Sequence, residues 1–198
     1  MKLHIGSGTA PLEGWINIDI GAHAGVDLTL DVRRGLPFSD VDFIFAEHFL
    51  EHLTLAEGIA FLRECRRILE PNGVLRLSTP NLDWVWLTHY KHPSEMSEDE
   101  ELRGCLEMNR AFHGWGHKFL YNPRTLTLAL HEAGFETVTP RRYGESDNRD
   151  LHGLERHERH EDLAGAPSVI VVEAVGRHDP TGDFSAGIAP YVRDADAQ

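Results

Sequence analysis

Two segments of the chain concentrate side chains that can transfer protons or bind ligands. Residues 80–120 and 144–165 hold seven of the 13 histidines. His117 and His113 are the candidate general bases, because a neutral imidazole accepts a proton near pH 7. Glu155 or His157, in the second segment, is the candidate partner that orients the ring. This pattern favours an enzyme that removes a proton from its substrate.

Two other interpretations of these side chains stay open. His113 and His117 lie four residues apart and would share a helical face, although Gly114 and Gly116 disfavour a helix there. In an irregular loop, both rings would instead satisfy backbone groups. A divalent metal site is a further option, since several His and Glu side chains could converge on one ion. No ligand spacing is diagnostic, so the sequence assigns no metal ligand.

A glycine pair follows the first expected strand. Lys2–Ile5 leads into Gly6, Ser7 and Gly8, and a backbone without β-carbons can turn sharply and approach a ligand closely. Position 11 is a proline, and only residues 9–15 lead to the next strand. This connection is too short for the usual crossover helix, whose N-terminus would support a pyrophosphate. We expect a ligand without phosphates; a tight turn that binds nothing is the alternative.

Two aspartates close the next two expected strands. Asp19 ends the second strand, where a carboxylate can accept hydrogen bonds from both hydroxyl groups of a ribose. Asp31 ends the third strand and is followed by Val32. The carboxyl ends of parallel strands share one edge of the sheet, so these residues and the glycine pair should line one ligand site. Capping of a helix or turn is the alternative role for such aspartates.

These residues need a scaffold of short strands that end at one edge. Short apolar runs alternate with helical patterns in the first half, as in a βαβ architecture. Thr54 should cap a helix whose apolar face extends to Leu69, with Pro71-Asn72-Gly73 ending it. Ser97 and Asn122 should cap two more helices, which run to Phe112 and to Gly134. The expected strands are Lys2–Ile5, Ile16–Asp19, Asp27–Leu30, Val41–Ala46, Val74–Ser78, Glu136–Arg142 and Ser168–Val175.

Composition and charge disfavour several kinds of partner. Lys and Arg number 19 against 32 Asp and Glu, a formal charge of −13, so the surface should repel nucleic acid and anionic membranes. Two cysteines and the lack of a signal peptide or membrane-length apolar run predict a cytoplasmic protein. The length suits one domain, expected over residues 1–178, with a poorly ordered tail over 179–198. A homodimer is compatible with this composition.

In order and spacing, several motifs resemble the class I S-adenosylmethionine-dependent methyltransferases. The resemblance is to a small bacterial branch, and it covers roughly residues 2–80, with a weaker echo at 126–135. It implies a Rossmann-like α/β fold: a mostly parallel seven-stranded sheet with an antiparallel last strand, a loop in place of the first crossover helix, and insertions after strands 5 and 6. The matching segments are residues 3–8, 14–19, 31, 36–38, 42–48, 50–53 and 69–75.

The resemblance also implies a role for each matching position. Gly6, Ser7 and Gly8 would approach the methionine part of the cofactor, and Asp19 its ribose. Asp31 and the backbone at Val32 would lie at the adenine. Glu47 and His48, just after the fourth strand, would lie near the methyl group that is transferred. Residues 46–49 are Ala-Glu-His-Phe, unlike the motif of methyltransferases that act on amino groups of DNA bases or glutamine amides, so we expect no nucleic-acid substrate.

The expected function is methyl transfer from S-adenosylmethionine to a small-molecule or sugar hydroxyl by in-line displacement. We expect the insertions 80–120 and 144–165 to fold together as a lid that forms the acceptor pocket. Segments around His113, His117, Gly144–Ser146 and Gly153–His157 resemble methyltransferases of polysaccharide assembly and favour a saccharide acceptor. The alternatives are a non-catalytic module that binds S-adenosylmethionine or S-adenosylhomocysteine, a metal-assisted O-methyltransferase, and, less favoured, a nicotinamide or nucleotide-sugar oxidoreductase.

Overall fold

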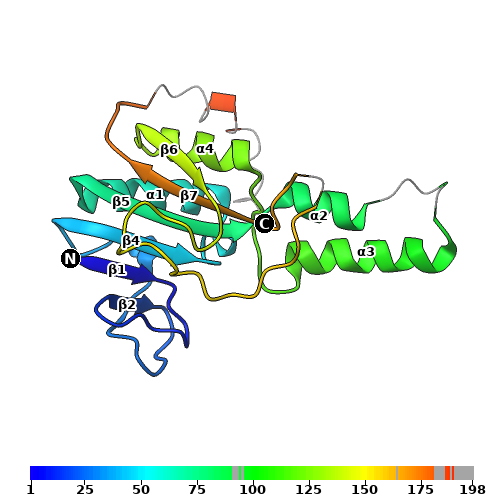
Figure 1. The fold of residues 1–198 in the computed structure, drawn as a ribbon, viewed down its shortest axis with the longest axis horizontal. Coiled ribbons are helices and arrows are strands. Elements are labelled where there is room, and N and C mark those ends of the chain that lie inside the picture. The colour runs from blue at the N-terminus through cyan, green and yellow to red at the C-terminus, as the bar shows by residue number, and fades with distance from the viewer. Residues whose placement is uncertain (91–93, 95, 164, 181–185, 188, 190–198) are drawn as a thin grey trace.

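A seven-stranded sheet forms the centre of the computed structural model, which describes residues 1–90, 94, 96–163, 165–180, 186, 187 and 189. The strand order is β3-β2-β1-β4-β5-β7-β6, and β7 alone runs in the direction opposite to the other strands (Figure 1). This is the fold class predicted from the sequence. The strands are β1 (Lys2–Ile5), β2 (Ile16–Asp19), β3 (Leu28–Thr29), β4 (Val41–Glu47), β5 (Leu69–Pro80), β6 (Thr137–Arg141) and β7 (Val169–Val175).

The predicted helix caps are confirmed. Thr54 and Ser97 each form a capping box with the glutamate three residues later, Glu57 and Glu100, and Asn122 accepts from the backbone N–H of Thr125. The helices are α1 (Leu55–Ile68), α2 (Leu82–His89), α3 (Glu98–His113) and α4 (Pro123–Glu132), with short 3₁₀ turns η1 (Val32–Arg34) and η2 (Leu50–His52). Within the described residues, no helix combines the length and apolarity needed to cross a membrane.

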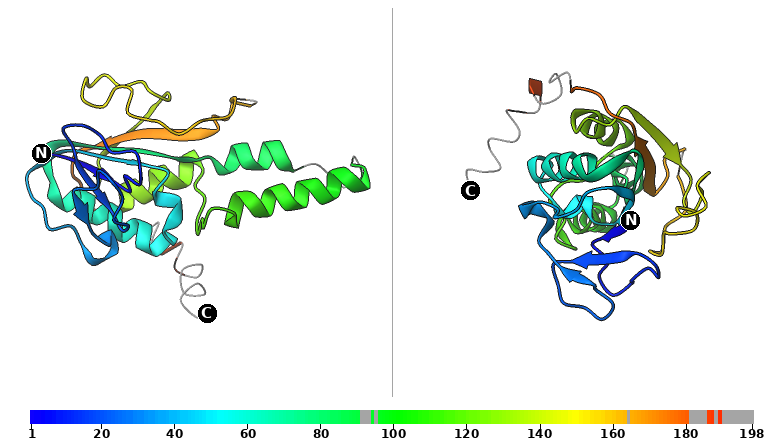
Figure 2. Two further views of the ribbon diagram at one scale, coloured as in Figure 1. Left: turned by 90° about the horizontal axis from the view of Figure 1, so that it is seen from below. Right: turned by 90° about the vertical axis from the view of Figure 1, so that its left-hand side faces the viewer.

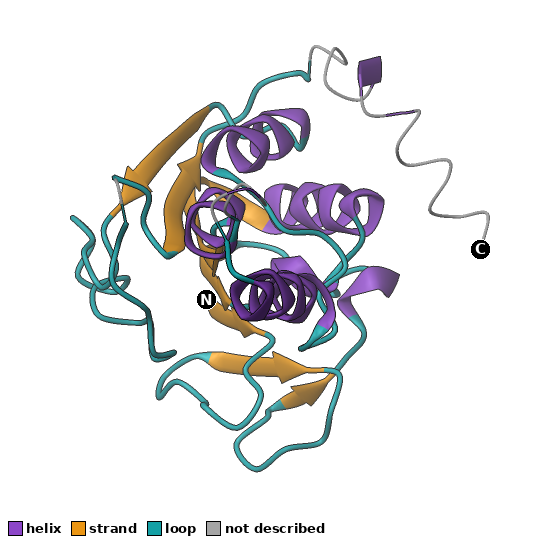
Figure 3. Cartoon of the chain, turned by 90° about the vertical axis from the view of Figure 1, so that its right-hand side faces the viewer, coloured by secondary structure: helices purple, strands orange, loops and turns teal. Residues whose placement is uncertain are grey.

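The two faces of the sheet are covered differently. Helices α1 and α4 pack on one face over the main apolar core, which includes Ile5, Ile44 and Leu62. Loops cover the other face, where Trp15 and Leu154 belong to a smaller cluster (Figure 3). No helix forms over residues 9–15, as predicted from the length of that connection. The second face is therefore covered by the connection between β1 and β2 together with the insertion after β6.

Helices α2 and α3 form an arm that projects from the edge where β5 ends (Figures 1 and 2). The sequence did not predict α2, in which the apolar residues Trp84, Val85, Trp86 and Leu87 are consecutive and give no helical period. No residue of α3 is buried. The two helices of the arm contact each other.

Several predicted boundaries were wrong. Pro71-Asn72-Gly73 does not end α1, which stops at Ile68, and lies within β5 instead. Leu69 pairs with Val41 and Val74 with Phe43, and the ladder is irregular between these two pairs, where the turn residues lie. Strand β3 has two residues, against four expected. Most of the expected tail, 179–198, lies outside the described residues.

Candidate active site

The glycine turn after β1 is held in place by β2. The N–H groups of Gly6 and Ser7 both donate to the carbonyl of Ile18, at 2.8 and 3.1 Å. Asp19 accepts from the N–H of Gly8 at Oδ2 and from that of Gly21 at Oδ1, both at 2.8 Å. The carboxylate therefore fixes the turn, and each oxygen keeps a lone pair for a further donor.

The inner surface of this turn leaves room for a ligand. Gly6 has a φ of 68°, and a β-carbon there would lie 2.6 Å from the Phe49 ring. Gly8 has a φ of 49°, and its β-carbon would meet nothing within 4 Å. Ser7 is buried, and its hydroxyl has no hydrogen-bond partner among the described residues. A buried hydroxyl without a partner is unfavourable unless a ligand or water satisfies it.

Asp31 makes local contacts. Its carboxylate caps η1 through the N–H of Arg33 and receives two further hydrogen bonds, each 2.8 Å long, from the Arg33 guanidinium. These bonds lower the pKa of Asp31 to about 2. Val32, beside it, is buried. Asp31 thus caps η1, which is the alternative role considered for it. A contact with a ligand would come in addition to this role.

Glu47, at the end of β4, connects the sheet edge to the insertion after β6. Its carboxylate accepts from the N–H groups of Arg156 and His157 at 3.0–3.1 Å and lies 3.1 Å from the His157 ring. Burial alone would raise the pKa of Glu47, but these hydrogen bonds bring it below its usual value. The hydrogen bond from the ring to Glu47 raises the pKa of His157.

His48 lies between this contact and η2. Its φ of 47° is unusual for a residue with a β-carbon, and its ring centre is 4.6 Å from that of His157. Its Nδ1 is 3.2 Å from Oε1 of Glu51. The Glu51 side chain is fully buried, and its other oxygen accepts from the Thr79 hydroxyl at 3.0 Å. A positive φ that places a ring at the sheet edge is the kind of strain found at functional sites.

The backbone of Glu51 brings residues 117–119 to this edge. Its carbonyl accepts from the N–H groups of Lys118 and Phe119, at 2.7 and 3.2 Å. As a result, the His52 and His117 rings lie with centres 5.2 Å apart. Ligand atoms of Glu51, His52 and His117 lie within 4.8 Å of one another. We refer to these three residues as the Glu51 cluster.

The expected pairs between the two insertions do not form. His113 is exposed at the end of α3, whereas His117 belongs to the Glu51 cluster. Glu155 is bound by the buried guanidinium of Arg76 at 2.7 Å, and Arg76 also contacts Glu173. His157 contacts Glu47 and His48. Neither Glu155 nor His157 therefore orients His113 or His117.

Sequence reasoning gave no role to Glu51 or His52. Both occur in the segment Leu50-Glu51-His52-Leu53, which carried part of the family resemblance. Their position in the sequence, four and five residues after Glu47, could have identified them as site residues. A single 3₁₀ turn brings a chain segment of this length back to the edge of the sheet.

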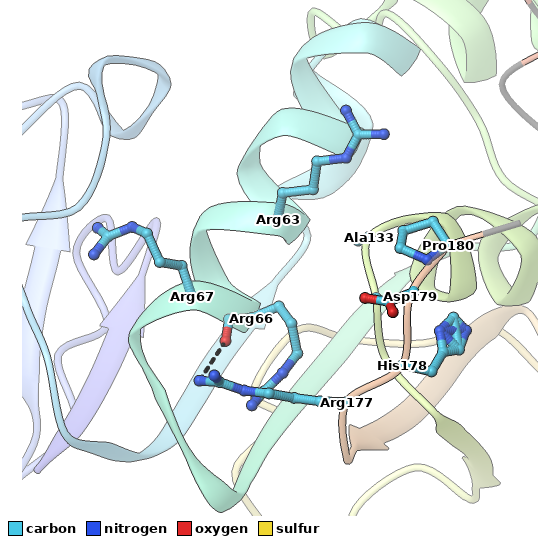
Figure 4. Close-up of a pocket in the computed structure, with 9 residues that line it drawn as sticks. Arg63, Arg66, Arg67, Ala133, Arg177, His178, Asp179 and Pro180 are labelled. Carbon is cyan, nitrogen blue, oxygen red and sulfur yellow. Dashed lines mark hydrogen bonds between the residues drawn. The ribbon is translucent and has the colours of Figure 1, made fainter. Parts of the chain in front are cut away.

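A hollow of about 420 Å³ lies at the opposite edge, where β5 begins and β7 ends. Figure 4 shows arginines of α1, Arg63, Arg66 and Arg67, with Arg177 beside them. Ligands of open α/β sheets bind at the carboxyl ends of the strands. The hollow therefore lies away from the glycine turn and from His48, His52 and His117, although His178 lines it.

A family model settles what kind of protein has this sheet edge. The model described as a methyltransferase domain matches residues 13–139, well over half of the chain. The chain belongs to the methyltransferase-domain family. It is a class I S-adenosylmethionine-dependent methyltransferase, as the sequence motifs indicated.

Solved structures share the fold of this methyltransferase at low sequence identity. DhpI in complex with SAH (S-adenosylhomocysteine) is 16% identical in sequence, with a TM-score of 0.53. The match covers 90% of this chain and 76% of DhpI. A methyltransferase from Thermotoga maritima is 18% identical with a TM-score of 0.56, covering 89% and 81%. One from Archaeoglobus fulgidus is 17% identical with a TM-score of 0.53, covering 87% and 84%.

Other proteins with this fold are longer. The chain spans 50% of PigF and 48% of the CurJ carbon methyltransferase. A comparison with curated protein sequences gives no match.

Proposed function

We propose that this methyltransferase transfers the methyl group of S-adenosylmethionine to a hydroxyl group of a small acceptor, with a saccharide as the favoured class. The observation that carries the proposal is the shared sheet edge. The glycine turn at Gly6–Gly8 lies after β1, and the histidines His48, His52 and His117 gather after the neighbouring β4.

The residues around the glycine turn suit an adenosyl ligand without phosphates. Asp19 has lone pairs for ribose hydroxyl groups, and the backbone at Gly8 faces open space. The unpartnered hydroxyl of Ser7 is available to the amino-acid part of the ligand. Asp31 and Val32 are proposed at the adenine. S-Adenosylmethionine supplies a methyl group on a positively charged sulfur, and no phosphate-binding helix is needed for it.

The acceptor side needs a group that removes a hydroxyl proton. His117 is the proposed base, because its Nδ1 lies 2.7 Å from the Ala111 carbonyl. A carbonyl only accepts, so Nδ1 carries the hydrogen and Nε2 keeps a free lone pair. Trp115 is 56% exposed, with its ring centre 5.7 Å from that of His117. An exposed aromatic ring beside the base suits stacking against a sugar.

The two insertions contribute different things to this site. We propose one domain over residues 1–178, with 80–120 supplying His117 and 144–165 supplying His157. The insertions contact each other where the Trp84 indole donates to the Glu161 carbonyl at 2.9 Å and stacks on His160. This contact supports the idea that they enclose the acceptor together.

Calorimetric titration with S-adenosylhomocysteine tests the cofactor site. Gly8→Ala should weaken binding at least tenfold, because its methyl group would enter the proposed ligand space. Gly14→Ala is the matched control: Gly14 has a φ of 75° and an equally open environment, so it carries the same backbone strain away from the site. Equal affinities of both variants would contradict the proposal.

A second experiment separates an enzyme from a binding module. Incubation with S-adenosylmethionine carrying a labelled methyl group and a panel of saccharides should give a labelled product. Tight binding of S-adenosylhomocysteine without transfer to any hydroxyl would reject the catalytic part of the proposal.

A further inference from the structure

We infer that Glu51, His52 and His117 bind one divalent transition-metal ion, which in turn binds the acceptor hydroxyl. The inference rests on the proposed function and replaces the role of His117 as a free base by that of a metal ligand, because a metal-bound Nε2 has no lone pair left to accept a proton. Its starting point is geometric: two imidazoles and one carboxylate, from η2 and from the segment after α3, offer atoms within 4.8 Å of one another.

Both imidazoles are held in the form that binds metals. His52 Nδ1 faces the Gly116 carbonyl at 3.4 Å, and His117 Nδ1 faces the Ala111 carbonyl at 2.7 Å. Because a carbonyl only accepts hydrogen bonds, Nδ1 of each ring carries the hydrogen and Nε2 keeps its lone pair. Hydrogen bonds of this kind behind the ligands orient histidines in metal sites.

The carboxylate supplies an independent observation. Glu51 is fully buried, and its Oε1 has no hydrogen-bond partner among the described residues. His48 Nδ1 is 3.2 Å away but outside hydrogen-bond geometry. A buried carboxylate oxygen without a donor is costly, and a cation removes that cost. Oε2, which accepts from Thr79, keeps the side chain in this orientation.

The ligand set predicts which ions bind. Two nitrogens and one carboxylate oxygen suit Zn²⁺, Co²⁺ or Fe²⁺, whereas Mg²⁺ prefers an oxygen shell. Ligand atoms around a tetrahedral Zn²⁺ lie about 3.4 Å apart, given metal–ligand distances of about 2.1 Å. The ligand atoms of the Glu51 cluster lie within 4.8 Å of one another, so side-chain rotations would have to bring them closer when an ion binds. Three protein ligands leave coordination positions for the acceptor, as in catalytic rather than structural sites.

The ion would activate the acceptor as follows. Coordination lowers the pKa of the hydroxyl group, which releases its proton to solvent. The oxygen then uses a lone pair to form a bond to the methyl carbon while the carbon–sulfur bond breaks, and the sulfur keeps that electron pair as a neutral thioether. An acceptor with two adjacent hydroxyl groups, such as a sugar diol, could supply two ligands if the ion expands from four to five coordination positions, and is the preferred class.

The test is calorimetric titration of the purified, metal-free protein with Zn²⁺, together with the visible absorption of Co²⁺. Glu51→Gln and His117→Gln should each remove one binding event and the Co²⁺ spectrum. His113→Gln and His152→Gln are controls, because these exposed histidines lie outside the cluster. These two variants show how much of the signal comes from nonspecific binding of Zn²⁺ to surface histidines. His52→Gln is a third test variant should either of the first two fail to fold, as judged by circular dichroism.

Each outcome has a clear meaning. One site lost in the cluster variants and kept in the controls supports the inference, as does Zn²⁺ binding at least a hundredfold tighter than Mg²⁺. The same Zn²⁺ stoichiometry in all variants overturns it. Intact Zn²⁺ binding with no binding of S-adenosylhomocysteine would contradict the proposed function and leave the metal site standing.

Discussion

The carboxylate of Glu47 binds both the backbone N–H and the ring of His157, a residue 110 positions later in the sequence. The contact joins β4, the strand beside the glycine turn, to the insertion that covers the second face of the sheet. It also places the His157 ring against His48. One buried carboxylate thus helps to hold the insertion over the proposed methyl-transfer site, together with the ion pair of Glu155 with Arg76.

The Glu47–His157 pair should make stability depend on pH. The pKa of His157 is raised in the folded protein, so its contribution is complete below about pH 6.5 and is lost as pH rises through the folded value. The pKa of Glu47 is lowered, so its contribution is present above about pH 4.5 and is lost as pH falls through the folded value. The stabilisation should peak near pH 5–6.

Urea unfolding of the wild type and of His157→Gln across pH 4–9 measures this effect. The difference in the free energy of unfolding should stay below about 1 kcal/mol, because the His157 side chain is 56% exposed. It should shrink towards pH 9. A difference that grows with pH would show that His157 acts as a neutral ring instead.

Glu155 should matter for stability more than for cofactor binding. Glu155→Ala leaves the buried Arg76 with one carboxylate partner in place of two, and loss of a buried ion-pair partner costs about 3 kcal/mol. Affinity for S-adenosylhomocysteine, measured at a temperature where the variant is folded, should stay within about threefold of wild type. The exposed Glu158 provides a matched control, and Glu158→Ala should change the free energy of unfolding by less than about 0.5 kcal/mol.

The sequence predicted the elements of this fold well where local rules decide. Capping residues, apolar periodicity and glycine turns act over a few positions, so Thr54, Ser97 and Asn122 marked three helices correctly. The antiparallel last strand was implied by the family resemblance alone. The start of β5 at Leu69 was missed, because Pro71-Asn72-Gly73 has strong turn propensity and the pair before it, Leu69 with Val41, joins residues far apart in the sequence.

The site was harder to predict, because its contacts join distant segments. Glu155 and His157 are two residues apart, yet one binds Arg76 within the sheet and the other binds Glu47 at the edge. The approach of His117 to Glu51 comes from backbone hydrogen bonds, which no side-chain pattern encodes. His113 and His117 look equivalent in the sequence, and only the end of α3 at His113 separates them.

His117 and His113 should therefore differ in turnover. His117→Gln removes the free Nε2 lone pair at the sheet edge and should reduce methyl transfer at least a hundredfold. His113→Gln changes an exposed ring and should leave the rate within about twofold. The measurement is product formation at saturating S-adenosylmethionine, once an acceptor is in hand. A greater loss for His113→Gln would reverse the assignment.

Asp19 should act on the cofactor through the glycine turn. Asp19→Ala removes the acceptor for the N–H groups of both Gly8 and Gly21, together with the proposed contact to ribose. Affinity for S-adenosylhomocysteine should fall at least a hundredfold, since several hydrogen bonds at about 1 kcal/mol each are lost. Asp27→Ala is a suitable control, because Asp27 accepts hydrogen bonds from Asn17 near the same strand but outside the turn. A comparable loss in both variants would indicate general damage to β2.

Arg66 offers a way to stabilise the protein without touching the active site. Its side chain is almost completely buried over the Phe135 ring, and none of its guanidinium nitrogens has a partner among the described residues. Burial, with Arg177 nearby, lowers its pKa to about 10. Met has a similar length and no charge to desolvate, so Arg66→Met should raise the free energy of unfolding by about 2 kcal/mol.

Urea unfolding measures this change, and Arg63→Met is the control. Arg63 is half exposed and pairs with Glu132, so its loss should be neutral or slightly destabilising. A destabilised Arg66→Met would show instead that the guanidinium is satisfied in solution, for example by an anion in the hollow of Figure 4.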